Sequence, residues 1–154
     1  MFFYCNARSL KNKLNHLNYL TNLNYHILGF TETWLNSSIE NYSLLANSDY
    51  AIFRTDRKTK GGCVAIFVKS DLLPILLDSF IIQGINLLTV LVYNVCIILV
   101  YIPPKFVHHT EGHKHILITG DFNFPNINWS NPSLTCTTTE DMFTNFVQYC
   151  HCHN

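Results

Sequence analysis

The sequence of 154 residues is poor in charge and has no excess of either sign. Only 13% of its residues are charged, about half the usual share, and ten cations balance ten carboxylates. Proteins whose main task is to hold nucleic acid are usually basic, because contacts to phosphate supply most of their affinity. The even balance therefore argues against tight non-specific binding to nucleic acid, while leaving room for a local basic face.

No pair of its six cysteines has the CxxC spacing. Several lie inside apolar runs, where a free thiol packs as a small hydrophobic group, and such usage is typical of a reducing compartment rather than a disulfide framework. The first residues, "MFFYCNARS", have neither the basic start nor the cleavage site of a signal peptide. We therefore expect an intracellular protein, cytoplasmic or nuclear.

One long stretch lacks charge altogether. No residue between Asp78 and Lys105 is charged, and the run "INLLTVLVYNVCIILVYI" (85–102) is long enough to cross a bilayer as a helix. Half of this run is β-branched, however, and it is flanked by a glycine and by two prolines, which is turn chemistry. The pattern favours two adjacent buried strands that turn near Asn94 over a membrane helix.

Other short apolar runs, separated by polar turns, predict further strands. "FFYCNAR" begins as a strand at the start of the chain, with Asn6 following the apolar "FFYC", and "HILGF" at 26–30 is continuously apolar, as a buried strand is. "YAIFR" (50–54) and "CVAIFVK" (63–69) flank the polar, glycine-ending segment "TDRKTKGG", which predicts a hairpin. "ILIT" (116–119) is the last predicted strand and leads into "GDFNFPNINW".

Leucines at intervals of three and four residues predict a helix between the first two strands. They lie in the segment 9–26, where Ser9 is the expected N-cap. The leucines are Leu10, Leu14, Leu17, Leu20 and Leu23. A second, short amphipathic helix is expected at 138–150. Strand, helix and strand followed by paired strands indicate one mixed α/β domain over residues 1–154, a length too short for two comfortable domains.

Polar side chains directly follow three of the predicted strands. They are Asn6, Glu32, Asp121 and Asn123. In α/β sheets the strand ends deliver side chains into a common cleft. Glu32 could hold Mg²⁺, Asp121 could take a proton from a water, and Asn123 could donate a hydrogen bond to an oxyanion. Singly, each is better explained as a polar strand end that favours a turn, but the four together favour a functional site.

Five motifs in order resemble the endonuclease/exonuclease/phosphatase superfamily. They are "NARSLKNKL", "ILGFTETWL", "FRTDRKTKGGCVAIFV", "LVYIPP" and "GDFNFPNINW". Within it the sequence is most similar to the apurinic-like endonuclease domain of LINE-type retrotransposons, from residue 2 to about 150. The resemblance implies a four-layer α/β sandwich, two packed β-sheets flanked by helices, and metal-dependent hydrolysis of a phosphodiester by an activated water. In retrotransposons this reaction nicks target DNA to prime reverse transcription.

The resemblance also implies roles for single residues. Asn6 resembles an active-site asparagine near metal and phosphate, and Glu32 the principal ligand of Mg²⁺ or Mn²⁺. Tyr101 occupies the place of a tyrosine that orients the phosphate. Asp121 resembles the residue that activates or positions the attacking water, and Asn123 the partner that stabilises the transition-state oxygens. The implied partner is DNA, with no small-molecule cofactor and no membrane.

The third motif, "FRTDRKTKGGCVAIFV", also matches the family. Asp56 and Arg57 lie in a family segment, but the resemblance assigns them no clear function. Gly61 and Gly62 are expected to serve backbone geometry. Cys63 occupies a position where a third glycine is usual.

The sequence also departs from the family pattern. The family's last motif, Ser-Asp-His, is absent, "KFVHHTEGHKH" is shorter than the corresponding family segment, and Ile102 replaces a common arginine. These departures predict a domain that lacks its C-terminal portion, with an incomplete second half that leaves a sheet edge and an apolar face exposed. The histidine-rich segments 108–115 and 151–153 show no recognised ligand spacing, so we do not expect them to bind zinc or to replace the missing histidine.

Two functions remain open on these residues. The first is a Mg²⁺-dependent endonuclease domain, degenerate or inactive, because losing one catalytic partner commonly removes several powers of ten in rate. The second is a non-catalytic remnant that binds nucleic acid or protein through the former cleft. Arg8, Lys11 and Lys13 would give it only a thin basic footprint.

Overall fold

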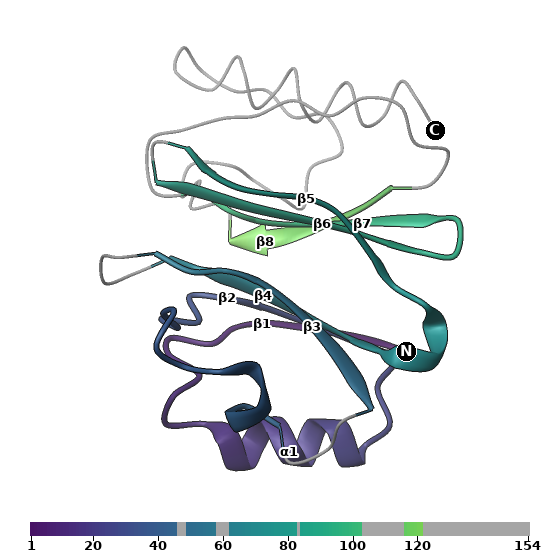
Figure 1. The fold of residues 1–154 in the computed structure, drawn as a ribbon, viewed down its shortest axis with the longest axis horizontal. Helices are drawn as coiled ribbons and strands as arrows, with labels where there is room; N and C mark the ends of the chain where they lie inside the picture. The colour runs from purple at the N-terminus through teal and green to yellow at the C-terminus, as the bar shows by residue number, and fades with distance from the viewer. Residues whose placement is uncertain (46–48, 58–61, 83, 103–115, 122–154) are drawn as a thin grey trace, which may run out of the picture.

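The structure, a computed structural model, describes residues 1–45, 49–57, 62–82, 84–102 and 116–121. Within these residues two four-stranded β-sheets lie face to face, and helix α1 (Leu14–Asn22) covers the outer face of one of them (Figure 1). The predicted sandwich of two packed sheets is thereby confirmed. The helix expected at 138–150 lies outside the described residues.

The first sheet, sheet A, is built from the N-terminal half of the chain. Its strands in spatial order are β1 (Phe2–Asn6), β2 (Ile27–Thr31), β4 (Val64–Lys69) and β3 (Tyr50–Thr55). β1 and β2 are parallel, as two strands joined through a helix can be, whereas β4 is antiparallel to both of its neighbours. The expected hairpin of β3 and β4 is confirmed.

The second sheet, sheet B, follows in the chain. Its strands in spatial order are β5 (Ile75–Ile82), β6 (Ile85–Val92), β7 (Val95–Tyr101) and β8 (Ile116–Asp121). β6 and β7 are the predicted strand pair, turning at Tyr93–Asn94. Among the described residues no helix is long and apolar enough to cross a membrane. β5 was not predicted: Asp78 and Ser79 interrupt its apolar run.

Helix α1 begins later than the leucine spacing predicted. Ser9 is not its N-cap: the cap is Lys13, and Leu10 lies before the helix. The reason is tertiary, because residues 7–10 stay attached to the chain that follows β2. The backbone N–H of Ser9 donates to the carbonyl of Glu32 at 2.8 Å, and that of Leu10 to the carbonyl of Thr33 at 2.9 Å. Ser9 also has a φ of 83°, which is not helical.

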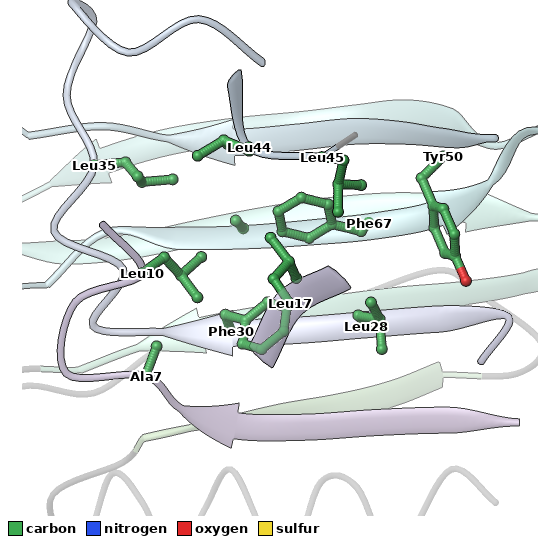
Figure 2. Close-up of a cluster of buried hydrophobic side chains, with 11 residues drawn as sticks. Ala7, Leu10, Leu17, Leu28, Phe30, Leu35, Leu44, Leu45, Tyr50 and Phe67 are labelled. Atoms are coloured by element: carbon green, nitrogen blue, oxygen red, sulfur yellow. The ribbon is translucent and has the colours of Figure 1, made fainter. Parts of the chain in front are cut away.

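The two faces of sheet A bury separate apolar clusters. On the outer face Leu17 of α1 packs with Phe30 and Phe67, whose rings meet edge to face at 5.6 Å (Figure 2). Along β4, Val64 and Ile66 alternate with Ala65 and Phe67, so they point to the inner face of sheet A. There they pack against sheet B. Burying each side chain of this size contributes about 2 kcal/mol, so β4, buried on both faces, anchors the sandwich.

Strand register brings seven strand ends to one end of the sandwich. In sheet A, Asn6 pairs with Thr31, and Thr31 and Thr55 both pair with Val64. These residues form one row across sheet A. A second row lies in sheet B, where Tyr101 pairs with Asn86 on one side and with Asp121 on the other. Because residues paired across neighbouring strands point to the same face, the paired side chains of sheet A lie together, and so do those of Asn86 and Tyr101 in sheet B. Thr31, Val64 and Tyr101 belong to the faces that meet between the sheets.

Candidate functional site

Glu32 follows the last residue of β2, and two donors hold its carboxylate. Its Oε2 accepts a hydrogen bond from the indole Nε1 of Trp34 at 2.5 Å and one from the backbone N–H of Gly62 at 3.3 Å. Both bonds go to the same oxygen. The side chain is half-buried, so the carboxylate has a fixed orientation and still reaches solvent.

Asn6 ends β1, the strand that neighbours β2 in sheet A. It pairs with Thr31, the residue before Glu32, and its side chain is exposed. Its Oδ1 accepts the backbone N–H of Arg8 at 3.1 Å. Lys13 donates to the carbonyl of Ala7, which fixes the loop that follows. Asn6 and Glu32, the two predicted metal ligands, therefore lie at the same end of neighbouring strands.

Gly62 is the point on which side chains from both sheets converge. A Cβ built on it would lie 2.6 Å from Nη1 of Arg57, 2.7 Å from Oδ1 of Asn86 and 3.1 Å from Cε1 of Tyr101. No side chain has room there, and the φ of Gly62, 69°, also favours glycine. The backbone role expected for this glycine is confirmed, while Gly61 lies outside the described residues.

Cys63 adopts a backbone conformation that suits glycine better. Its φ is 67°, and its backbone N–H donates to Oδ1 of Asn86 at 3.0 Å. The Sγ accepts the backbone N–H of Arg57 at 3.3 Å. Burial raises the pKa of the Cys63 thiol, so the side chain is a neutral packing group at neutral pH.

Backbone strain gathers at this end of the sandwich. Non-glycine residues with positive φ in its loops are Arg8, Ser9, Glu32, Trp34 and Cys63. Such conformations cost about 1–2 kcal/mol each and persist only where the surroundings determine them, which is common at functional sites. Strain therefore accompanies the same loops that hold the Glu32 carboxylate.

Tyr101 is the last residue of β7 and lies in the middle of the row of paired residues in sheet B. It pairs with Asn86 on one side and with Asp121 on the other, and its side chain is buried between the sheets. The backbone of Asp121 is the last of β8, which packs near β1 and β2. The side chain of Asp121 and the whole of Asn123 lie outside what the structure describes, so their predicted roles stay predictions.

Two residues of the site were not assigned a role from the sequence. Asn86 is fully buried, and its Nδ2 has no hydrogen-bond partner in the described part of the chain. The sequence did contain a signal for Asn86. An amide inside the apolar, uncharged run 85–102 is a buried polar group that needs hydrogen-bond partners. Arg57 had been noted without a role, and its guanidinium now lies against Gly62.

Asp56, the other residue without an assigned role, belongs to a structural clamp. Its Oδ2 accepts from Nη2 of Arg54 at 2.7 Å, and both side chains are largely buried, 16% and 12% exposed. The same Nη2 donates to the carbonyls of Asn36 at 3.0 Å and Ile39 at 2.6 Å. Arg54 therefore ties the loop after β2 to β3, and Asp56 holds the guanidinium of Arg54 in place.

A pocket of about 320 Å³ lies elsewhere, between α1 and β1. Its wall is mostly apolar, including Phe3, Leu17 and Phe30 from the outer face of sheet A, with Asn6 at one end. Glu32, Arg57 and Asn86 do not line it. The candidate site is thus the strand ends and not this pocket.

The donor set suits a magnesium ion better than a closed metal centre. In the described ranges no group of three or more His, Cys, Asp or Glu side chains could hold a metal. Mg²⁺ keeps several waters and is usually bound through one or two carboxylates plus substrate phosphates. A single oriented carboxylate, Glu32, at the end of a strand fits that requirement.

The family follows from a direct match. The family model described as Endonuclease/Exonuclease/phosphatase family matches residues 5–150. The chain belongs to this family. No curated protein matches the sequence.

Solved structures share the family fold at low identity. The 3' phosphatase NExo from Neisseria, bound to product DNA hairpin, has a TM-score of 0.68 and 15% identity over 95% of this chain and 69% of its own. The 3'-5' exonuclease NExo from Neisseria meningitidis gives 0.67, with the same identity and coverage. An AP endonuclease from Archaeoglobus fulgidus gives 0.50 and 19% identity, over 69% of this chain and 41% of its own.

Proposed function

We propose that this chain is a metal-dependent phosphodiesterase domain of the LINE retrotransposon type, whose substrate is DNA and whose reaction is strand nicking. The observation that carries the proposal is the Glu32 carboxylate, oriented by Trp34 and Gly62 at the end of β2, whose neighbour β1 ends at Asn6. An oriented carboxylate at a strand end is what a magnesium ion shared with a phosphate requires. The five ordered motifs support the LINE branch.

Each proposed role is the one that the family resemblance implies for that residue. Glu32 and Asn6 would hold Mg²⁺ or Mn²⁺, which when bound stabilises negative charge on the phosphate. Tyr101 orients the phosphate from the end of β7. Asp121, paired with Tyr101 at the end of β8, activates or positions the attacking water, and Asn123 donates to the transition-state oxygens.

We further propose that the reaction is slow in this chain. Its 154 residues contain no Ser-Asp-His motif, and removing one partner of a catalytic unit commonly lowers the rate by several powers of ten. Binding of metal and of DNA depends on residues that are present, so both should persist. The chain would then behave as a weak nuclease, or in the limit as a DNA-binding remnant.

The test is supercoiled-plasmid nicking by the purified 154-residue chain with Mg²⁺, beside Glu32→Ala and Asp121→Ala. We expect slow nicking that stops with chelator and is lost in both variants. Glu40→Ala is the matched control, because Glu40 is an exposed glutamate away from the strand ends, and it should nick as the parent does.

Nicking that survives chelator or Glu32→Ala would contradict the proposed site. No nicking by a protein shown to be folded, together with retained binding of duplex DNA, would assign the chain to the non-catalytic alternative. No binding of DNA at low salt would overturn the DNA substrate altogether.

A further inference from the structure

The proposed reaction does not use the pocket between α1 and β1. Its volume of about 320 Å³ is at the lower end of the range usual for sites that bind small molecules. It lies where α1 covers β1, which is an edge strand of sheet A among the described residues. A concave apolar surface in contact with water becomes more stable when a ligand covers it.

The wall of the pocket is apolar and partly open. Leu17 and Phe30, which are 1% and 2% exposed, contact each other at its buried side (Figure 2). Phe3 and Cys5 of β1 and Leu20 of α1 also line the pocket and are only half-buried. α1 therefore leaves part of β1 open to solvent, and the two phenylalanine rings can pack against a flat aromatic ligand.

Lys13 holds a positive charge in a fixed position at this pocket. Its side chain lines the pocket, and its Nζ donates to the carbonyl of Ala7 and, at 3.4 Å, to that of Arg8. An ammonium group has three N–H donors, so one remains for a ligand. Burial raises the pKa of the Cys5 thiol, and the charge of Lys13 opposes that increase. The charge of Lys13 is therefore felt by a residue of the pocket wall.

The charge of the pocket favours an anion. Lys13 and His16, at the start of α1, both line it, and none of the described residues that line it is acidic. Hydrogen bonds between ionised partners are shorter and stronger than those between neutral groups. A mostly apolar wall with a few placed polar groups is the usual composition of a small-molecule site, and here the placed group is a cation.

We propose that this pocket binds a small aromatic carboxylate, with the ring between α1 and β1 and the carboxylate on Nζ of Lys13. The inference goes beyond the proposed function, because it needs neither metal nor DNA. Asn6 lies at one end of the pocket, so the ligand would contact the strand that carries a proposed metal ligand.

The experiment compares two probes of nearly the same shape. Naphthoate is an anion, and naphthamide is its neutral amide. Each is titrated into the 154-residue chain without metal or DNA, and binding is followed by calorimetry and by NMR of the backbone amides. We expect naphthoate to bind about tenfold more tightly, because only the anion forms a charge-assisted hydrogen bond with Lys13. The amide signals that shift should belong to 3–7 and 13–20, which line the pocket.

Two substitutions test the pocket and its charge separately. Leu20→Trp should fill the pocket and weaken both probes at least tenfold. The matched control is Leu23→Trp, at an exposed leucine that does not line the pocket, and it should bind as the parent does. Lys13→Gln should lower the affinity for naphthoate to that for naphthamide, because glutamine can still donate to a carbonyl but has no charge. Lys13→Arg should restore the preference, and Lys11→Gln, at an exposed lysine outside the pocket, should keep it.

Equal affinity of the parent chain for the two probes would overturn the inference, and so would no binding of either probe to the folded chain. Naphthoate binding that is as strong in Leu20→Trp as in Leu23→Trp would place the probe outside the pocket. If Leu20→Trp does not fold, the amide signals of the parent decide, and shifts confined to residues other than 3–7 and 13–20 would exclude this site. These outcomes leave the proposed function untouched, because plasmid nicking tests it separately.

Discussion

Glu32 and Asn86 accept hydrogen bonds from consecutive backbone N–H groups. The N–H of Gly62 donates to Oε2 of Glu32 at 3.3 Å, and the N–H of Cys63 donates to Oδ1 of Asn86 at 3.0 Å. One residue follows β2 of sheet A and the other lies in β6 of sheet B. Two adjacent peptide groups therefore connect the loop after β2 and strand β6 of the other sheet to one turn.

Trp34 should tune metal binding through Glu32. Trp34→Phe keeps an aromatic ring but removes the indole N–H that donates to Oε2. Loss of a hydrogen bond that orients a ligand commonly weakens metal affinity 10- to 100-fold, so we expect Mn²⁺ to bind about tenfold more weakly, as measured by calorimetry or electron paramagnetic resonance. Tyr19→Phe, on an exposed ring of α1, serves as control. Equal affinity in both variants would exclude a positioning role.

Gly62→Ala should destabilise the fold as well as the site. The new Cβ would lie 2.7 Å from Oδ1 of Asn86, which cannot retreat because it is buried and bonded to Cys63, and the φ of 69° adds strain. We expect the free energy of unfolding in urea to fall by about 2 kcal/mol. Gly29→Ala is the control, since its Cβ would meet neighbours at 3.6 Å or more. A loss no larger than that of Gly29→Ala would show that the turn adapts.

Raising the pH should weaken the fold through Cys63. Burial raises the pKa of this thiol above its ordinary value of 9.0, so the folded state favours the protonated form. That contribution is complete below pH 9.0 and is lost as pH rises through the higher pKa of the folded state. The free energy of unfolding should therefore fall above that pH, and less steeply in Cys63→Ala. Labelling of Cys63 by a thiol reagent in the folded protein at pH 8 would contradict this account.

Arg54 should matter for stability and not for DNA binding. Arg54→Ala removes the group that joins Asp56 to the carbonyls of Asn36 and Ile39, and leaves a largely buried carboxylate without its partner. Breaking a buried pair in this way costs about 3 kcal/mol, measurable by urea unfolding. Arg8→Ala, at an exposed arginine, should change stability by less than about 0.5 kcal/mol. A folded Arg54→Ala protein with reduced affinity for DNA would mean that the clamp belongs to the site.

Much of the fold was predictable because its signals are local. Apolar runs bounded by turns located β1, β2, β3, β4, β6, β7 and β8, and the β-branched content of 85–102 correctly favoured strands. β5 was not predicted because Asp78 and Ser79 interrupt the apolar run "ILLDSFII" at 75–82, and its exposed Ile75 and Leu76 do not follow the usual division of faces. The predicted start of the helix was wrong because tertiary contacts override a regular local pattern. The leucine spacing is regular through Leu10, but hydrogen bonds to residues 32 and 33 keep that stretch out of the helix.

The sequence by itself determined which polar residues follow strands, and so placed Asn6, Glu32, Asp121 and Asn123 as candidates for one site, to which the family resemblance added Tyr101. Only the tertiary structure decided that Asn86 and Arg57 join them, and that Trp34 and Gly62 hold the Glu32 carboxylate. The physical reason is the sequence separation of the residues that interact. Strand formation depends on alternation over a few residues, whereas the Gly62 and Cys63 bonds join positions 30 and 23 residues apart. Those contacts exist only after register and sheet packing are fixed.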